Sequence, residues 1–315
     1  MYFNNIDLPI SPASLTKLMT GLILFENYEL SEQLTILLPE NYKYEGKVAY
    51  LQTGDVMSTE QLLEFLLVYS ANDAAYAAAL QVSSSVDEFV YLMNLKAKQL
   101  GMQNTSFTNP EGLDDNNHFT TLSDLLKLSI YIVEKTKLID ITSKNSFLYE
   151  SENKIETFNT TNMLLKKGYV GLKTGWTTNA GLTFIGLKSI NDRSILTIVN
   201  RSNVNEEKTK HFDDTEILFE TSVQNFGIQI LLKNGEPLYL QRIPEQSHLF
   251  YIKQDWIKFG ELKNIPKINF RLNGNQNIEF SISDEILNNM YIDKKSVSVK
   301  YNFFKSNLIS KLINK

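Results

Sequence analysis

Ser14-Leu15-Thr16-Lys17 is the stretch that decides the fold of this 315-residue chain. Apolar residues recur through it at helical spacing, and they predict a helix from about Pro12 to Phe25. Side chains three positions apart share one face of a helix, so the Ser14 hydroxyl and the Lys17 amine can touch, and an amine can accept the hydroxyl proton. Alone this spacing is weak, because many proteins contain a helix-initial serine followed by a solvated lysine.

Two further motifs give the first one its context. Ser70-Ala71-Asn72 follows the run Gln61–Val68, which is apolar nearly all round and predicts a buried helix. Lys173-Thr174-Gly175 precedes two alternating apolar segments, Leu182–Leu187 and Ser194–Val199, which predict a β-hairpin. Ser-x-x-Lys, Ser-x-Asn and Lys-Thr-Gly in this order form one catalytic signature for acyl transfer. Coincidence in an unrelated fold is the alternative, and the three settings together argue against it.

Composition limits the classes of function. A net charge of −5 gives no basic surface, so we expect no nucleic-acid partner. The absence of cysteine excludes disulfides, thiolate metal sites and cysteine nucleophiles. The three histidines, His118, His211 and His248, are scattered along the sequence, so we expect surface or loop positions and no metal site. We expect no other cofactor.

The pattern predicts two domains and a tail. Residues 1–226 carry helix-capping pairs such as Ser58 with Gln61, Ser85 with Glu88 and Thr121 with Asp124. Residues 227–300 alternate at period two, with Asn234-Gly235 and Asn273-Gly274 as hairpin turns, and predict a small β-rich domain. In the tail, 301–315, apolar residues fall four apart. This spacing fits either an amphipathic helix on a membrane surface or a terminal helix that packs on the protein.

With these motifs in place, the chain resembles the D-alanyl-D-alanine carboxypeptidases, the low-molecular-mass penicillin-binding proteins of peptidase family S11. The likeness covers residues 5–226 and rests on four stretches: Pro12–Thr20, Ser70–Ala75, Thr108–Asp124 and Gly171–Thr177. It implies an α/β fold of the α+β type, the serine DD-peptidase/β-lactamase-like domain, in which helices flank an antiparallel sheet. A small β-rich C-terminal domain would follow.

The resemblance also implies a signal peptide and two strands ahead of the nucleophile helix. Only thirteen residues precede Ser14, and they lack the basic region and apolar core of a signal peptide. We therefore expect a sheet without its N-terminal strands. No run of eighteen apolar residues predicts a transmembrane helix. A location outside the cytoplasm, in the periplasm or on the outer face of the cytoplasmic membrane, follows from the resemblance alone.

The activity implied is removal of the terminal D-alanine from peptidoglycan stem pentapeptides through an acyl-enzyme on Ser14, which β-lactam antibiotics would trap. Lys17 would be the base, provided that burial or a nearby cation such as Lys173 keeps it neutral. Ser70 would relay a proton to the leaving amine. Asn72 would hold Lys17 and the substrate amide. Ser70 and Asn72 would otherwise merely cap helices.

The resemblance assigns substrate binding to the third motif. Lys173 and Thr174 would bind the substrate's terminal carboxylate, although Lys173 can also be read as a strand-edge charge. Gly175 would allow close approach of the strand. The backbone N–H groups of Ser14 and Trp176 would hold the oxyanion, although Trp176 can also be only a wall of the cleft.

Three other functions stay open. A class A β-lactamase needs a glutamate on a loop, and Glu111 lies in the right interval, but its surroundings match the carboxypeptidase pattern. We assign Glu111 and Asp114 to loop structure. A DD-endopeptidase of the same fold would cut cross-links. A catalytically inactive peptidoglycan-binding scaffold would keep the fold without the reaction.

Overall fold

The computed structural model describes residues 5–151, 154–190, 193–232, 237–243, 246–251, 256–261, 267–272, 278–283 and 301–304. The contacts between residues divide the chain into two units. One unit is Phe3–Glu220 and the other contains Thr221–Lys315, so the division falls inside the helix α7.

The first unit contains most of the helices. They are η1 (Ala13–Thr16), α1 (Lys17–Asn27), α2 (Thr59–Leu63), η2 (Glu64–Tyr69), α3 (Asn72–Val82), α4 (Val86–Gln99), α5 (Leu122–Lys135), α6 (Leu138–Thr142), η3 (Met163–Lys167) and α7 (Lys210–Asn225). Its strands are β1 (Gln33–Thr35), β2 (Val56–Ser58), β3 (Ser146–Ser151), β4 (Lys154–Asn159), β5 (Tyr169–Thr177), β6 (Gly181–Ile190) and β7 (Arg193–Ser202).

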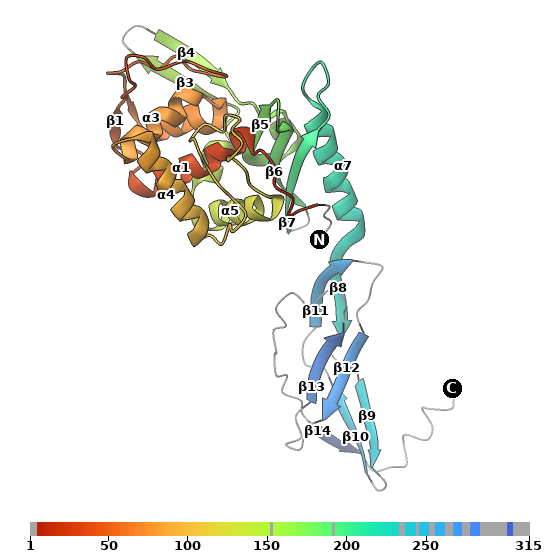
Figure 1. Cartoon of the computed structure of the whole chain (residues 1–315). Coiled ribbons are helices and arrows are strands. Elements are labelled where there is room, and N and C mark those ends of the chain that lie inside the picture. The colour runs from red at the N-terminus through yellow and green to blue at the C-terminus, as the bar shows by residue number, and fades with distance from the viewer. Residues whose placement is uncertain are drawn as a thin grey trace. The chain divides into compact units, whose positions relative to one another are not determined.

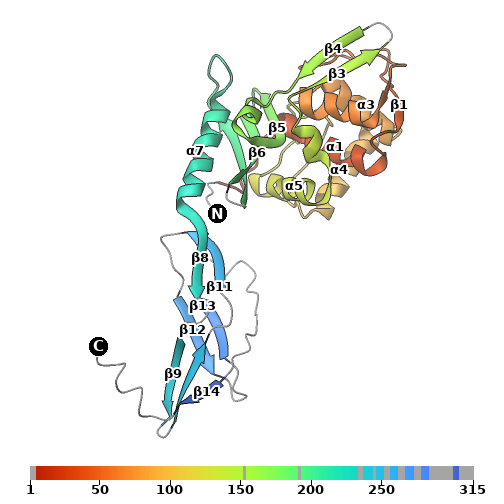
Figure 2. The same ribbon diagram turned by 180° about the vertical axis from the view of Figure 1, so that it is seen from behind.

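An antiparallel sheet in the order β5-β6-β7 lies between two helical layers. Helix α7 covers one face and the group containing α1, α3, α4 and α5 covers the other (Figures 1 and 2). Successive side chains of a strand point to opposite faces, and β6 shows the result. Phe184 meets the ring of Phe212 on α7, whereas Ile185 belongs to the core formed by the helical group. The predicted fold, an antiparallel sheet with flanking helices, is confirmed.

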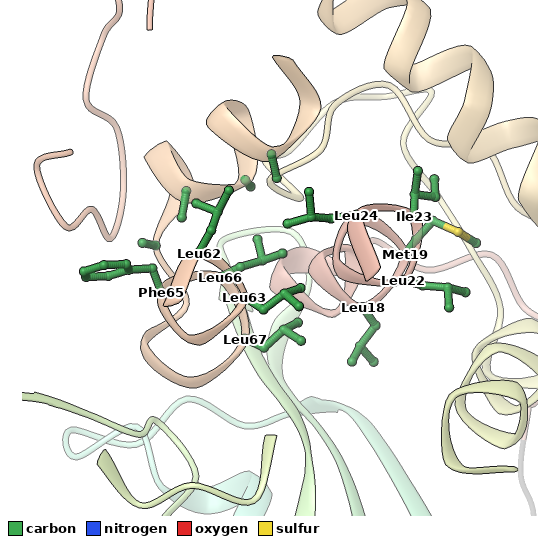
Figure 3. Close-up of a cluster of buried hydrophobic side chains, with 14 of the residues drawn as sticks. Leu18, Met19, Leu22, Ile23, Leu24, Leu62, Leu63, Phe65, Leu66 and Leu67 are labelled. Carbon is green, nitrogen blue, oxygen red and sulfur yellow. The ribbon is translucent and has the colours of Figure 1, made fainter. Parts of the chain in front are cut away.

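Leucine side chains bury helix α1 against α2 and η2. Leu18 and Leu22 of α1 and Leu63 and Leu66 of the partner helices have no exposed surface (Figure 3). Gly21 permits this approach, because a Cβ there would lie 3.2 Å from a methyl carbon of Leu67. The packing fixes the start of α1, where Lys17 stands.

The caps of the helices agree in part with the sequence. Ser58 and Gln61 form the expected reciprocal capping box at the start of α2. Ser85 caps α4, but the Glu88 carboxylate accepts hydrogen bonds from Ser84 instead of closing the box. The side chain of Thr121 accepts a hydrogen bond from the Asp124 N–H at the start of α5, as expected.

Three local details of the structure differ from the sequence prediction or add to it. The helix expected from about Pro12 to Phe25 is present, but it begins as the 3-10 turn η1 and becomes α-helical at Lys17. The β3–β4 hairpin was not expected. His118 lies in a loop, as expected, but is buried there with 2% exposure, whereas His211, expected at the surface or in a loop, lies in α7 with 4% exposure.

After the end of α7, the described part of the second unit consists of strands. They are β8 (Phe226–Leu232), β9 (Pro237–Ile243), β10 (Gln246–Tyr251), β11 (Trp256–Glu261), β12 (Lys267–Leu272), β13 (Ile278–Ser283) and β14 (Tyr301–Phe304). β12 pairs with β13 across the segment that contains Asn273-Gly274, as expected. The strands on either side of Asn234-Gly235 do not pair with each other, because β8 pairs with β11 and β9 with β10.

The expected tail helix differs from the structure where it can be compared. Residues Tyr301–Phe304 form β14, which pairs with β10. Residues 305–315, which carry the rest of the expected amphipathic pattern, lie outside the described residues. Within the described ranges, no helix has both the length and the apolar character needed to cross a membrane.

Candidate active site

Ser14 and Lys17 stand where the 3-10 turn η1 passes into α1. Lys17 is the first residue of α1, and its Nζ donates a hydrogen bond of 3.0 Å to Ser14 Oγ. The pair is therefore in contact, as the three-residue spacing predicts. Ala13 has a positive φ of 50°, an uncommon conformation for a residue with a side chain.

The Lys17 side chain has no exposed surface and three oxygen partners. Besides Ser14 Oγ, its Nζ donates to Asn72 Oδ1 at 2.6 Å and to the main-chain oxygen of Glu111 at 2.7 Å. Burial lowers the pKa of Lys17 to about 7, against the opposing effects of the Glu111 and Asp73 carboxylates. A neutral amine near pH 7 can accept a proton.

Lys47, whose ammonium lies 4.0 Å from the centre of the Tyr69 ring, helps to lower the pKa of Lys17. Lys173, the cation expected in this role, also interacts with Lys17, because the Lys17 charge is among the causes that lower the pKa of Lys173. Burial is the largest cause of the shift, and Lys47 adds to it. Lys17 is thus kept near neutrality chiefly by removal from water.

The unusual end of η2 places Ser70 and Asn72. Residues Glu64–Tyr69 form a π-helix, which closes at Ser70 with φ 74° and ψ 34°. Such π-type turns are frequent at functional sites. Helix α3 then begins at Asn72, whose Nδ2 donates to the main-chain oxygen of Glu45 at 2.8 Å. Gly46 lies against this amide, because a Cβ there would come within 2.7 Å of Nδ2.

Lys173 on β5 contacts Ser70. Its Nζ donates to Ser70 Oγ at 2.8 Å and to the Thr174 main-chain oxygen at 3.1 Å. Burial, with smaller effects from Lys17 and Lys47, lowers the pKa of Lys173 well below its ordinary value. The Thr174 hydroxyl donates to Thr161 Oγ1 at 2.6 Å, a partner that the sequence did not indicate.

Gly175 is the point where β5 touches the 3-10 turn η1, which carries Ser14 and is called the serine turn below. A Cβ there would lie 3.1 Å from Ser14 N and 2.5 Å from Thr183 Oγ1. Trp176 is 44% exposed, with the Lys208 ammonium 3.5 Å from the centre of its ring. The structure therefore joins Ser14, Lys17 and Asn72 by hydrogen bonds, joins Ser70 to Lys173 by another, and leaves the ring of Trp176 at the surface.

The loop at 108–118 contributes more than turn chemistry. Glu111 is 6% exposed, and burial raises the pKa of its carboxyl group. Gly112 packs so closely on the serine turn that a Cβ would overlap the Ala13 main-chain oxygen. Asp114 accepts hydrogen bonds from Ser11 and Thr177, which ties the loop to the segment just before η1 and to β5.

His118 contacts the serine turn through Thr16, the last residue of η1. The Thr108 N–H donates to Nδ1 at 3.0 Å, so the hydrogen of the neutral ring lies on Nε2, which donates to Thr16 Oγ1 at 2.9 Å. Burial lowers the pKa of His118 to about 4, and the ring is neutral at pH 7. The sequence assigned Glu111 to loop structure and His118 to a surface or loop position, because each is a single residue in a polar, turn-rich stretch.

Asp73 was also missed by the sequence reading. Its carboxylate has no exposed surface and accepts hydrogen bonds from the N–H groups of Ala49, Leu51 and Ala74. It therefore fixes the segment that follows Lys47 onto the start of α3. Among the described residues, no cluster of three or more histidines and carboxylates is arranged to hold a metal ion.

Comparison with known proteins shows which family this chain resembles. Residues 1–203 match the family Peptidase S11, D-alanyl-D-alanine carboxypeptidase. The chain is similar to the D-alanyl-D-alanine carboxypeptidase DacF of Bacillus subtilis, with 30% identity over 70% of this chain and 60% of the relative. It is also similar to a D-alanyl-D-alanine endopeptidase of Pseudomonas aeruginosa, with 30% identity over 65% of each chain. The chain thus spans less than two-thirds of the length of these curated relatives.

Solved structures show the same fold. Penicillin-binding protein D2 of Listeria monocytogenes, in its cefotaxime-bound form, aligns with a TM-score of 0.61 and 30% identity over 70% of this chain and 91% of that chain. A peptidoglycan synthesis regulatory factor (PBP3) of Streptococcus pneumoniae aligns with a TM-score of 0.71 and 22% identity over 97% of this chain and 93% of that chain. The family match covers well over half of the sequence, and the chain therefore belongs to the D-alanyl-D-alanine carboxypeptidase family, peptidase S11.

Proposed function

We propose that this chain is a serine-type D-Ala-D-Ala carboxypeptidase that removes the terminal D-alanine from peptidoglycan stem peptides. The observation that carries the proposal is the fully buried Lys17 Nζ, 3.0 Å from Ser14 Oγ and 2.6 Å from Asn72 Oδ1. A serine becomes a nucleophile when a neutral base lies within hydrogen-bond reach. The name of the family and of relatives such as DacF supports the same reaction.

Acylation follows from these positions. Lys17 takes the proton of Ser14 Oγ as the oxygen attacks the carbonyl carbon of the penultimate D-alanine. The backbone N–H groups of Ser14 and Trp176 receive the developing oxyanion. Gly175 supports this assignment, because a Cβ there would lie in a tight contact of 3.1 Å with Ser14 N and would clash with Thr183 Oγ1 at 2.5 Å.

The leaving group departs on the side of Lys173. The Ser70 hydroxyl, which accepts a hydrogen bond from Lys173 Nζ, passes its proton to the amine of the departing D-alanine and receives the proton that Lys17 took from Ser14, so that Lys17 is neutral again. Lys173 supplies positive potential for the terminal carboxylate, and the Thr174 hydroxyl turns from Thr161 to donate to it. Water then hydrolyses the ester on Ser14. β-Lactams acylate the same oxygen and leave slowly.

The test is release of D-alanine from Nα,Nε-diacetyl-L-Lys-D-Ala-D-Ala. The wild-type chain is expected to release one D-alanine per peptide, and Ser14→Ala to release none above the uncatalysed rate. Absence of release by a folded wild-type protein that also fails to bind penicillin would favour the inactive scaffold. Rapid turnover of a chromogenic cephalosporin would favour the β-lactamase.

Endopeptidase activity is the second candidate, because two relatives, from P. aeruginosa and Escherichia coli, are named D-alanyl-D-alanine endopeptidases at 30% and 29% identity. Digestion of cross-linked muropeptides separates the two activities, since an endopeptidase yields monomers and a carboxypeptidase yields only free D-alanine. Both substrates lie outside the cytoplasmic membrane, and we place the chain there for that reason.

A further inference from the structure

The segment 45–51 is bound to the first two residues of α3 at every second position. The bound residues are Glu45, Lys47, Ala49 and Leu51. Asn72 donates to the main-chain oxygens of the first two, at 2.8 Å from its Nδ2 and at 2.7 Å from its N–H, and Asp73 accepts from the N–H groups of the last two. These bonds fix the backbone at Lys47 beside the start of the helix whose Asn72 also binds Lys17.

The ammonium group of Lys47 lies on an aromatic ring. It is 4.0 Å from the centre of the ring of Tyr69, the residue directly before Ser70. The Tyr69 ring packs edge-on against Phe158 of β4, with 4.8 Å between the ring centres, and is thereby held in place. Throughout the described ranges, no carboxylate forms an ion pair with Lys47. Its charge is therefore not cancelled by an ion-pair partner.

Exposure distinguishes Lys47 from the two other lysines of the site. Lys17 and Lys173 are buried, and burial is the main cause that lowers the pKa of each. Contact with the ring also removes part of Lys47 from water and lowers its pKa, but the exposed residue remains an ammonium near pH 7. Lys47 is thus the solvent-facing cation among these three lysines.

Charges from several elements act on Lys17. The carboxylates of Glu111, in the loop at 108–118, and of Asp73, on α3, raise its pKa, whereas the Lys47 charge lowers it. Lys173 of β5 is a further cation near Lys17, since the Lys17 charge helps to lower the pKa of Lys173. Lys47 therefore opposes two carboxylates that favour the protonated form of the base.

The other titratable groups packed near the base do not replace Lys47. Burial raises the pKa of the Tyr42 phenol, so this group is neutral near pH 7. The pKa of His118 is lowered to about 4 by burial, so the ring on Thr16 is neutral as well. Glu45 acts on Glu111, whose pKa it helps to raise.

We propose that Lys47 is a positioning residue for acylation, whose unpaired ammonium favours the neutral form of Lys17 that accepts the Ser14 proton. A permanent positive charge at residue 47 disfavours a second positive charge nearby, so Lys17 gives up its proton at a lower pH. The inference rests on the proposed function and adds an electrostatic control of its base. With Lys47 in place, the serine stays reactive at a lower pH than burial of Lys17 alone allows.

The test compares the pH dependence of acylation by benzylpenicillin in wild type and Lys47→Met, which keeps an unbranched apolar side chain and removes the charge. The acidic limb of the variant is expected to lie about 0.5 to 1 pH unit higher, as for loss of one partly screened charge. Its rate at pH 6 is then about three- to tenfold lower, whereas the rates above about pH 9 agree within about twofold. Lys47→Arg keeps the charge and the ring contact, and it is expected to restore the wild-type limb.

The matched control is Lys43→Met, since Lys43 is an exposed lysine four positions earlier that is not among the charges acting on Lys17. It is expected to leave the acidic limb in place. A limb of Lys47→Met at the wild-type pH, an equal shift in Lys43→Met, or an arginine variant that behaves like methionine would overturn the inference.

A direct titration of Lys17 separates this inference from the proposed function. Nuclear magnetic resonance of ¹³C-labelled lysine in Ser14→Ala follows the amine without any reaction, and Lys17→Arg identifies its signal. The pKa of Lys17 is expected near 7 and is expected to rise when Lys47→Met is added. If the wild type is not acylated but this rise is found, the proposed function fails and the role of Lys47 stands. If acylation proceeds and the pKa of Lys17 does not rise, the role of Lys47 alone is rejected.

Discussion

Lys17 and Asn72, which are 55 positions apart in the sequence, are joined by a 2.6 Å hydrogen bond from Nζ to Oδ1. The bond connects the first residue of α1 to the first residue of α3. The same amide donates from Nδ2 to the main-chain oxygen of Glu45. Asn72 therefore orients the base and holds one wall of the site at the same time.

Asn72→Ala is expected to slow acylation of Ser14 by penicillin about 10- to 100-fold, because Lys17 loses its shortest partner and its orientation. The second-order rate of labelling by a fluorescent penicillin measures the effect. Asn94→Ala is the control, since Asn94 makes two hydrogen bonds to Phe107 and one to the Val90 main-chain oxygen within α4 without contacting the site. Asn94→Ala is expected to lower stability and leave labelling of the folded protein unchanged. Equal slowing in both variants would contradict the role of Asn72.

The pH dependence of acylation follows from the protonation of Lys17. The amine is a base only when neutral, so the rate is expected to fall about tenfold per unit of pH below about 7. The Glu111 charge raises the pKa of Lys17, so Glu111→Gln is expected to move the acidic limb to lower pH. Stopped-flow acylation at a series of pH values shows both. A rate independent of pH, or a limb that moves upward, would exclude Lys17 as the base.

Stability at acid pH is expected to depend on His118. Its pKa is about 4 in the folded chain and about 6.5 when unfolded, so the unfolded chain binds the proton first as the pH falls. The contribution is complete above pH 6.5 and is lost as the pH falls through about 4, a change of about 3 kcal/mol. Urea unfolding of wild type and His118→Gln measures it. In the glutamine variant, the free energy of unfolding should no longer fall over this pH range. A pH dependence equal to that of the wild type would contradict the buried neutral ring.

Gly175→Ala tests the contact between β5 and the serine turn. The new Cβ would meet Thr183 Oγ1 and Ser14 N, so we expect a loss of acylation of at least about 100-fold with reduced stability. Thr183→Ala removes only the first clash, and Thr183 Oγ1 has no hydrogen-bond partner among the described residues. The double variant is expected to regain stability but not acylation. Recovery of acylation would show that the contact with Ser14 does not matter.

The sequence sufficed for the parts of the site that are short motifs. Ser14 and Lys17 are neighbours on one helical turn, and Ser70-Ala71-Asn72 leaves a helix whose apolar pattern is plain. Their roles could be inferred only together with the third motif. Its Lys173 is more than a hundred positions away from Ser70 in the sequence and yet contacts it. Order along the chain sufficed here because each motif is a short run of neighbouring residues.

Glu111, Asp73 and His118 could not be predicted in the same way, because their environment is made by tertiary packing. Asp73 reads as a first-turn acid of a helix, yet it binds the N–H groups of Ala49 and Leu51. His118 reads as a loop residue, yet the loop folds inward onto Thr16. The hairpin of β3 and β4 was missed for a related reason, since its residues buried against Phe65 have no strong alternation in the sequence.

The central claim is that Ser14 is a nucleophile activated by Lys17, and covalent labelling tests it most directly. After incubation with benzylpenicillin, the mass of the intact protein is expected to increase by one penicillin, and peptide mapping is expected to place the adduct on Ser14. Ser14→Ala should show no adduct, and Lys17→Ala should show it only after far longer incubation. An unmodified wild-type protein with native circular dichroism, or an adduct on another residue, would contradict the account.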